Sequence, residues 1–141
     1  MARAFEYRHV VAFDETNLVG NVYYVNHLRW QGLCRERFIE RHAPGALGED
    51  ADELTLVTTR CNCEYVAEIG AFDEIAVRMS FGEISGNTIP MRFEYVRVSG
   101  EREEIVARGE HEVRCMRRDG DGLHPAPVPD ALGEAIRNFT T

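Results

Sequence analysis

The sequence has no lysine and no excess of positive charge. All 16 basic residues are arginine, 24 residues are acidic, and the net charge is −8. Proteins that bind nucleic acid usually carry a basic surplus, so this function class is disfavoured. No apolar run approaches the ~18 residues of a membrane span, and the N-terminal segment lacks the shorter apolar run of a signal peptide. We therefore expect a cytoplasmic protein that neither binds nucleic acid nor enters a membrane.

The cysteine, histidine and glycine arrangements typical of metal and phosphate sites are also missing. Cys34, Cys61, Cys63 and Cys115 form no C-x-x-C pair. The five histidines, which have no metal-ligand spacing, are His9, His27, His42, His111 and His124. There is no G-x-S-x-G nucleophile motif and no glycine-rich phosphate loop. We expect four reduced structural thiols, no metal and no cofactor.

The features that are present predict one α+β domain over residues 1–141. The chain is 44% hydrophobic and 28% charged, an ordinary globular composition, and its length suits a single core. Periodicity predicts a strand at 5–13, a helix from 23 or 24 to 42, strands at 54–66, 74–81, 88–98 (bulged before Val96) and 104–117, and a helix at 130–138. A five-stranded antiparallel sheet wrapped around the long central helix accommodates this order.

The long helix is expected to be largely buried, because its apolar residues are not confined to one stripe. It follows a polar loop at residues 14–21. Its first backbone N–H groups have no partner inside the helix and lie at the positive end of the helix dipole. Such an end can stabilise an oxyanion, although every strand-to-helix loop offers free N–H groups. By itself the pattern therefore indicates only a candidate site.

Arg35 lies away from the charged side of this helix. The other charges, which share one broad arc, are Arg29, Glu36, Arg37, Glu40 and Arg41. A guanidinium on an apolar face is either paired or holds a ligand. The sequence leaves open an ion pair with a strand carboxylate such as Glu64 and a functional contact. His9 and His111, on apolar strand faces, are expected to be hydrogen-bonded core or interface residues.

The segment at 14–36 resembles a known family. Its pattern D-E-T-N-x-x-G-N-V-Y-Y-x-N-x-L-R-W-Q-G-x-C-R-E is similar to hotdog thioesterases related to 4-hydroxybenzoyl-CoA thioesterase, and more closely to those of enediyne polyketide biosynthesis. The resemblance continues through C-E-Y-V-A-E-I-x-A-F-D-E at 63–74 and the final strand. It implies the hotdog fold and a homotetramer of two dimers with sites at subunit interfaces. Val106 and Met116, expected on the outer sheet face, also favour assembly.

The resemblance implies a site without the family's usual carboxylate. The wider family has a catalytic aspartate in the loop, whereas the matching residue here is Asn17, whose amide cannot act as a base near neutral pH. The enediyne branch is similar in having this asparagine and a helix arginine that matches Arg35. Asn17 and Arg35 are therefore the implied catalytic residues. The implied substrate-binding residues are Tyr23, Tyr24, Val25, Glu36 and Thr59.

The implied reaction is hydrolysis of a polyene β-ketoacyl thioester on the acyl carrier domain of an iterative polyketide synthase. Asn17 would position water or the carbonyl, and Arg35 would hold the β-dicarbonyl oxygens. Backbone N–H groups near Tyr24 and Val25 would stabilise the oxyanion, and the released β-keto acid would lose carbon dioxide unaided. Two alternatives remain open: a general acyl-CoA thioesterase, which Asn17 disfavours, and a non-catalytic hotdog module that binds acyl chains.

Overall fold

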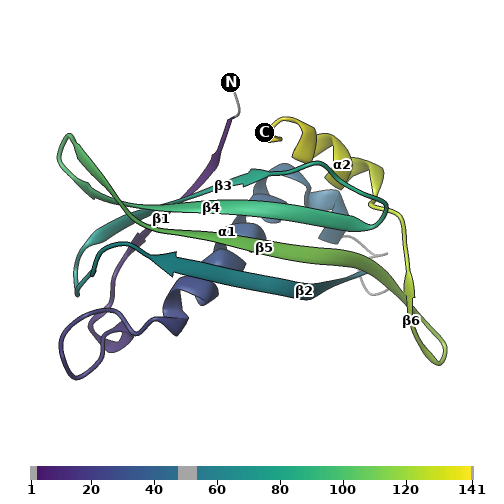
Figure 1. Cartoon of the computed structure of the whole chain (residues 1–141). Helices are drawn as coiled ribbons and strands as arrows, with labels where there is room; N and C mark the ends of the chain where they lie inside the picture. Colours follow the sequence, from purple (N-terminus) through teal and green to yellow (C-terminus); the bar gives the residue numbers. More distant parts are fainter. Residues whose placement is uncertain (1–2, 48–53, 141) are drawn as a thin grey trace.

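The computed structural model describes residues 3–47 and 54–140, which form a six-stranded antiparallel sheet with α1 against one face (Figure 1). The elements are β1 (Phe5–Val10), η1 (Phe13–Glu15), α1 (Val25–His42), η2 (Pro44–Leu47), β2 (Leu54–Tyr65), β3 (Glu74–Phe81), β4 (Thr88–Ser99), β5 (Arg102–Asp119), β6 (Gly122–Pro125) and α2 (Asp130–Arg137). The strand order is β1-β3-β4-β5-β2, and β6 pairs with β5. The predicted sheet around a central helix is thus observed.

The sheet has one strand more than the sequence predicted. β6 pairs antiparallel with the end of β5, from Met116 opposite Pro125 to Asp119 opposite Gly122. Proline lacks the N–H that a central strand needs, so a proline-containing segment can join a sheet at an edge. The sequence prediction treated this stretch as a lead into the tail helix. The extra strand exists because β5 runs on to Asp119.

Most predicted strand boundaries agree with the structure, and the first does not. β3 spans the predicted residues, and the expected bulge is confirmed by the register shift between Tyr95 and Val96. β1 ends at Val10 rather than at residue 13, because the chain turns into η1. Phe13, predicted as the last residue of this strand, is consequently 75% exposed.

Helix α1 buries one side rather than nearly its whole surface. Trp30, Cys34 and Phe38 are fully buried against the sheet, and their spacing of four residues places them on one stripe. Glu36 and Arg37 are exposed on the other side. Arginine and glutamate side chains on that side are exposed to solvent, so the prediction of a largely buried helix was wrong.

The core continues from α1 to α2 at one end of the sheet. The ring of Phe38 packs edge-on against Phe5 and Phe139 and lies 5.0 Å from that of Phe81. α2 contributes buried Leu132 and Ile136. This end is apolar, whereas the buried polar groups lie nearer the middle and the start of α1. No helix in the described ranges is long and apolar enough to span a membrane.

Candidate active site

The loop between β1 and α1 carries Asn17 on an exposed turn. The Asn17 Oδ1 accepts the backbone N–H of Val19 at 3.0 Å, and the Asn17 N–H donates to the Asn21 carbonyl at 2.9 Å. Gly20 has a φ of +92°, a left-handed conformation that favours glycine. The turn therefore fixes the Asn17 backbone, and the side-chain oxygen is engaged by the Val19 N–H.

A buried carboxylate, Glu15, anchors this loop to α1. Its Oε1 accepts the backbone N–H of Ala12 at 2.8 Å and bonds His9 Nε2 at 2.7 Å, while its Oε2 accepts the indole N–H of Trp30 at 2.9 Å. Burial raises the pKa of Glu15, but these hydrogen bonds outweigh it, and the pKa is lowered. Sequence reasoning missed Glu15, because one of two adjacent acids in a polar loop gives no local signal of burial.

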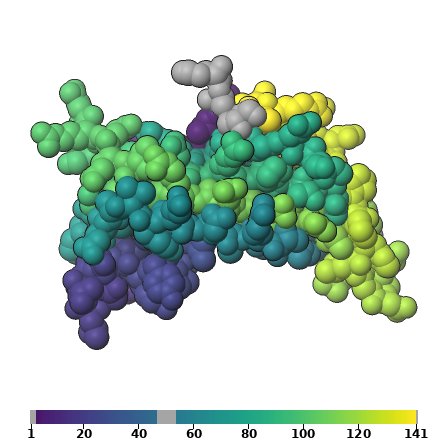
Figure 2. Space-filling view, viewed as in Figure 1, coloured from purple at the N-terminus to yellow at the C-terminus, as the bar shows by residue number. Residues whose placement is uncertain are grey.

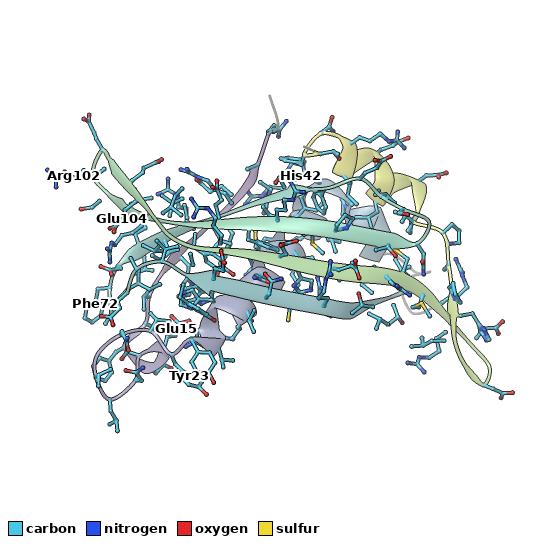
Figure 3. All side chains as sticks on the ribbon, viewed as in Figure 1. Glu15, Tyr23, His42, Phe72, Arg102 and Glu104 are labelled. Atoms are coloured by element: carbon cyan, nitrogen blue, oxygen red, sulfur yellow. The ribbon has the colours of Figure 1, made fainter. Side chains whose placement is uncertain are left out.

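The start of α1 lies beside this loop. Figure 3 places Glu15, Tyr23 and Phe72 at one end of the molecule. Tyr23, Tyr24 and Val25 are exposed there, and no backbone acceptor in the described ranges takes the N–H of Tyr24 or Val25. The Tyr65 hydroxyl donates to the Tyr24 carbonyl at 2.7 Å and holds the end of β2 against the helix. The helix start thus offers free N–H donors on a fixed frame.

Arg35 lies in the middle of α1 and reaches the sheet. Its Nη1 bonds His111 Nε2 at 3.2 Å, and the Thr58 hydroxyl lies 3.2 Å from the same nitrogen. No described carboxylate lies within ion-pair distance of Arg35, and Glu64 is instead exposed, opposite Arg108 in the β2–β5 register. The ion pair with Glu64 that the sequence left open does not form.

His111 belongs to a directional hydrogen-bond chain. A guanidinium can only donate, so His111 Nε2 accepts from Arg35 and Nδ1 carries the proton, which it donates to Gln31 Oε1 at 3.1 Å. Gln31 Nε2 donates in turn to the Asn62 carbonyl at 3.0 Å. Burial and the Arg35 charge lower the pKa of His111 to about 4. His111 is therefore a neutral, hydrogen-bonded histidine, as predicted, and it orients Arg35 without cancelling its charge.

The glycine at position 109 makes room for this chain. A Cβ there would lie 2.6 Å from the Asn62 carbonyl oxygen and would also collide with the Gln31 amide nitrogen. Gly109 lies opposite Cys63 in the register of β5 and β2. The glycine thus permits α1 to approach the sheet closely enough for Gln31 and Arg35 to reach it.

Apolar side chains enclose the other side of Arg35. Arg35 lines a void of about 10 Å³ between α1, α2 and the sheet. Its apolar walls include Ile39, Leu56, Met91 and Val113. A void of this size is no larger than a single water molecule needs. Burial also lowers the pKa of Arg35, and the charge of Glu36 opposes this shift.

Within one copy of the protein, the structure does not bring all the predicted site residues close together. Arg35 is ten residues along α1 from Val25, a rise of about 15 Å, whereas Asn17 lies in the loop before the helix. The hydroxyl of Thr59 donates to the Glu112 carboxylate at 2.7 Å, and Thr58 instead contacts His111. The reason is a register shift between Thr58 and Arg60, which leaves Thr59 without a ladder partner.

The cysteines do not contribute to this geometry. All four are free: Cys34 and Cys115 are buried, whereas Cys61 is exposed. In the described part of the chain, no group of three His, Cys, Asp or Glu side chains is arranged to hold a metal ion. What the site offers is a half-buried cation, free helix-terminal N–H groups and an exposed amide, a set that can stabilise negative charge developing on oxygen.

The chain belongs to the thioesterase-like superfamily, whose family model matches residues 11–136. That match includes the loop of Asn17, all of α1 and the strands from β2 to β6, and it confirms the resemblance and the hotdog fold. Among individual proteins, the chain is similar to the dynemicin thioesterase, with 48% identity over 98% of both chains and a TM-score of 0.94. Crystal structures of that protein reveal induced-fit and allosteric effects upon polyene binding. The family match and this similarity therefore support a thioesterase activity for the chain.

More distant structures share the fold. A 1,4-dihydroxy-2-naphthoyl-CoA thioesterase from Synechocystis is 17% identical, with 96% of this chain and 97% of that chain covered and a TM-score of 0.83. The 4-hydroxybenzoyl-CoA thioesterase from Pseudomonas sp. strain CBS-3 is 21% identical, with 95% and 99% covered and a TM-score of 0.78. Among curated protein sequences, no significant match was found.

Proposed function

We propose that this protein hydrolyses the thioester of a polyene β-ketoacyl chain on the acyl carrier domain of an enediyne polyketide synthase. The observation that carries the proposal is Arg35, a half-buried cation whose protein acceptor is the neutral His111 and which has no carboxylate partner in the described ranges. An enolisable β-dicarbonyl supplies the negative oxygen that such a cation lacks. The 48% identity to the dynemicin thioesterase supports a polyene chain.

The reaction needs no protein carboxylate. Water adds to the thioester carbonyl and releases a proton to solvent, the C–S bond breaks, and the thiolate leaves and takes a proton from solvent. The Asn17 amide positions the water or the carbonyl, Arg35 holds the β-dicarbonyl oxygens, and the N–H groups of Tyr24 and Val25 stabilise the oxyanion. Glu15 is the nearest buried carboxylate to this loop, and its two oxygens are occupied by hydrogen bonds. The β-keto acid released then loses carbon dioxide without a further catalyst.

A second subunit completes the proposed site. Asn17 and Arg35 lie apart within one copy of the protein. The reacting end of a substrate contacts both only if the two residues come from different copies. Within one copy, only a long acyl chain would span the distance between them. The long edge strand β2 is largely exposed and lies along a hollow between two projecting lobes (Figure 2). Pairing of this edge with a second copy would satisfy its free backbone groups.

The surface chemistry also favours assembly. Large apolar side chains gather in an exposed group on and beside the β1–α1 loop. This group includes Phe13, Leu18, Val19, Tyr23, Tyr24 and Phe72. Val106, expected on the outer sheet face, is instead fully buried, because the bulge between Tyr95 and Val96 changes the alternation of the paired strand. The proposed homotetramer therefore rests on the loop surface and the β2 edge, not on Val106.

Co-expression with the cognate synthase tests this function. We expect mass analysis to find a released polyene β-keto acid or its decarboxylated methyl ketone only when the active protein is present. Tight binding of a β-ketoacyl thioester without turnover would instead identify a non-catalytic acyl-binding module. Equal turnover of saturated acyl-CoA esters lacking the β-keto group would identify a general acyl-CoA thioesterase.

A further inference from the structure

Two donors from different elements approach the same nitrogen of His111. Arg35 Nη1, on α1, lies 3.2 Å from His111 Nε2, and Thr58 Oγ1, on β2, lies 3.2 Å from the same atom. The unprotonated nitrogen of a neutral imidazole has one lone pair, so it accepts only one hydrogen bond at full strength. Both distances exceed the ~2.7–3.0 Å at which hydrogen bonds are most often found. Arg35 and Thr58 therefore share one acceptor, and each weakens the bond that the other makes.

Gln31 fixes which nitrogen of His111 is the acceptor. Gln31 Nε2 donates to the Asn62 carbonyl at 3.0 Å, so Gln31 Oε1 faces the ring and accepts the proton of His111 Nδ1 at 3.1 Å. The other nitrogen, Nε2, then carries the lone pair, and His111 is only 8% exposed. A buried acceptor without a donor is costly. One of the two donors, Arg35 or Thr58, is therefore needed at Nε2 in every state of the site.

Thr58 is the donor that has no other partner. Within residues 3–47 and 54–140, its hydroxyl makes no hydrogen bond besides the one to His111. Thr58 lies opposite Val113 in the register of β2 and β5, so its side chain is on the face of His111 and diagonal to it. A hydroxyl proton rotates about the C–O bond to suit its acceptor. Thr58 can therefore take or release the lone pair of Nε2 without a change in the backbone.

We infer that Thr58 is a positioning residue that replaces Arg35 on His111 when Arg35 binds the β-dicarbonyl group, an inference that rests on the proposed function. Without a ligand, Arg35 and Thr58 share Nε2. When the β-dicarbonyl oxygens accept N–H groups of Arg35, the guanidinium moves off the ring and the Thr58 O–H turns onto the lone pair. The exchange leaves no buried nitrogen unpaired, so it lowers the cost of substrate binding by Arg35. Thr58 acts through His111 and does not touch the substrate.

A ligand that cannot be hydrolysed tests this exchange apart from turnover. A long-chain 2,4-dione presents the enolisable oxygens without a thioester, and titration calorimetry gives its Kd. Thr58→Val removes the hydroxyl and should raise Kd about five- to tenfold, the low end of the penalty for an unpaired buried acceptor. Thr58→Ser keeps a hydroxyl and should restore Kd. The matched control Thr55→Val changes a threonine of the same strand on the opposite face and should leave Kd unchanged.

A second background separates positioning from a structural role. His111→Phe keeps a ring but has no lone pair, so Thr58→Val should have no effect on Kd when it is added to His111→Phe. An increase in Kd of the same size in both backgrounds would overturn the inference, because Thr58 would then act independently of His111.

The dione also distinguishes this inference from the proposed function. If Arg35→Ala weakens dione binding but Thr58→Val binds as wild type does, only the inference is overturned. If Arg35→Ala leaves Kd unchanged, Arg35 does not hold the β-dicarbonyl oxygens, and both the proposed role of Arg35 and the inference fail. The expected Kd pattern together with no turnover of the β-ketoacyl thioester would contradict only the proposed hydrolysis.

Discussion

Two charged groups associated with α1 occupy opposite electrostatic situations. Near its start, Glu15 accepts three hydrogen bonds, and Arg29 lies 3.6 Å from its Oε2. In its middle, Arg35 has five N–H donors to offer and bonds one neutral acceptor, His111. The carboxylate is saturated, whereas most donors of the guanidinium have no protein acceptor in the described part of the chain.

The contrast shows which charge holds the structure and which is available for a ligand. A saturated buried carboxylate ties the loop, β1 and α1 together, and a further contact would have to displace one that already exists. A cation with unused N–H donors can donate to a substrate oxygen without breaking an ion pair. Charge of either sign can be buried, but only the group with unused hydrogen-bonding capacity can bind a ligand at low cost.

The largest expected effect comes from removal of the available charge. Arg35→Ala should fold and lose activity toward the β-ketoacyl thioester by on the order of 10²–10³-fold, the loss typical of one preorganised oxyanion contact. Arg37→Ala is the matched control, since Arg37 is exposed on the same helix and pairs with Glu40. Steady-state kinetics and circular dichroism of both variants provide the measurement. A folded, fully active Arg35→Ala protein would remove Arg35 from the site.

The second prediction concerns the loop residue that replaces a carboxylate. Asn17→Ala should sharply lower kcat and leave assembly intact, because its side chain is exposed and makes only a local turn contact. Asn17→Asp should also be slower on the β-ketoacyl substrate, because the new carboxylate would compete with the substrate for Arg35 across the interface. It should gain slightly on simple acyl-CoA, where a general base helps.

Kinetics on both substrates decide the outcome for Asn17. An Asn17→Asp enzyme that is faster than wild type on the β-ketoacyl thioester would contradict a site adapted to work without a carboxylate. Unchanged rates in both variants would place Asn17 outside the site.

The third prediction tests the saturated charge. Glu15→Gln should lower the free energy of unfolding by about 1–3 kcal/mol, because an amide cannot accept at both ends and leaves a buried N–H unpaired. Urea unfolding gives this value, and the folded variant should keep kcat within about tenfold of wild type. A stable variant that has lost its activity would mean that Glu15 is catalytic after all.

The smallest effect, a change of stability with pH, is expected from His111, the side chain that links Arg35 to the sheet. The pKa of His111 is about 4 in the folded chain against an ordinary 6.5, so between these values the unfolded chain binds a proton that the folded chain does not. Its contribution to stability is thus present above pH 6.5 and lost as the pH falls toward 4. With allowance for solvent screening, the loss is on the order of 1–2 kcal/mol.

The variant His111→Phe isolates that contribution. The pKa values of His27 and His42 are also lowered, so the wild-type profile is a sum, and only its difference from the variant reports His111. Urea unfolding at several pH values should show a shallower dependence in His111→Phe than in wild type or in the exposed control His124→Phe. Parallel profiles would show that His111 is not held neutral.

The sequence determined the features that depend on neighbours along the chain. Alternation predicted β3 at its observed residues, and the break in that alternation located the bulge before Val96. Pro44 and Gly45, residue types that favour the end of a helix, located the end of α1. The motif at 14–36 predicted the family. Arg35 could be singled out because the helical period separates it from the other charges. These signals are local, with a repeat of two or 3.6 residues, so a single chain displays them directly.

Only the tertiary structure decided what the polar groups do. Arg35 meets His111 across 76 positions, and Gln31 meets Asn62 across 31, contacts that depend on how α1 packs over the sheet. Thr58, and not the predicted Thr59, contacts His111 because of a register shift that local periodicity does not encode. Glu15 became a buried anchor because β1, the residue before η1 and α1 each contribute one donor. Hydrogen-bond partners are set by the distance between segments in space, and sequence separation carries almost no information about that distance.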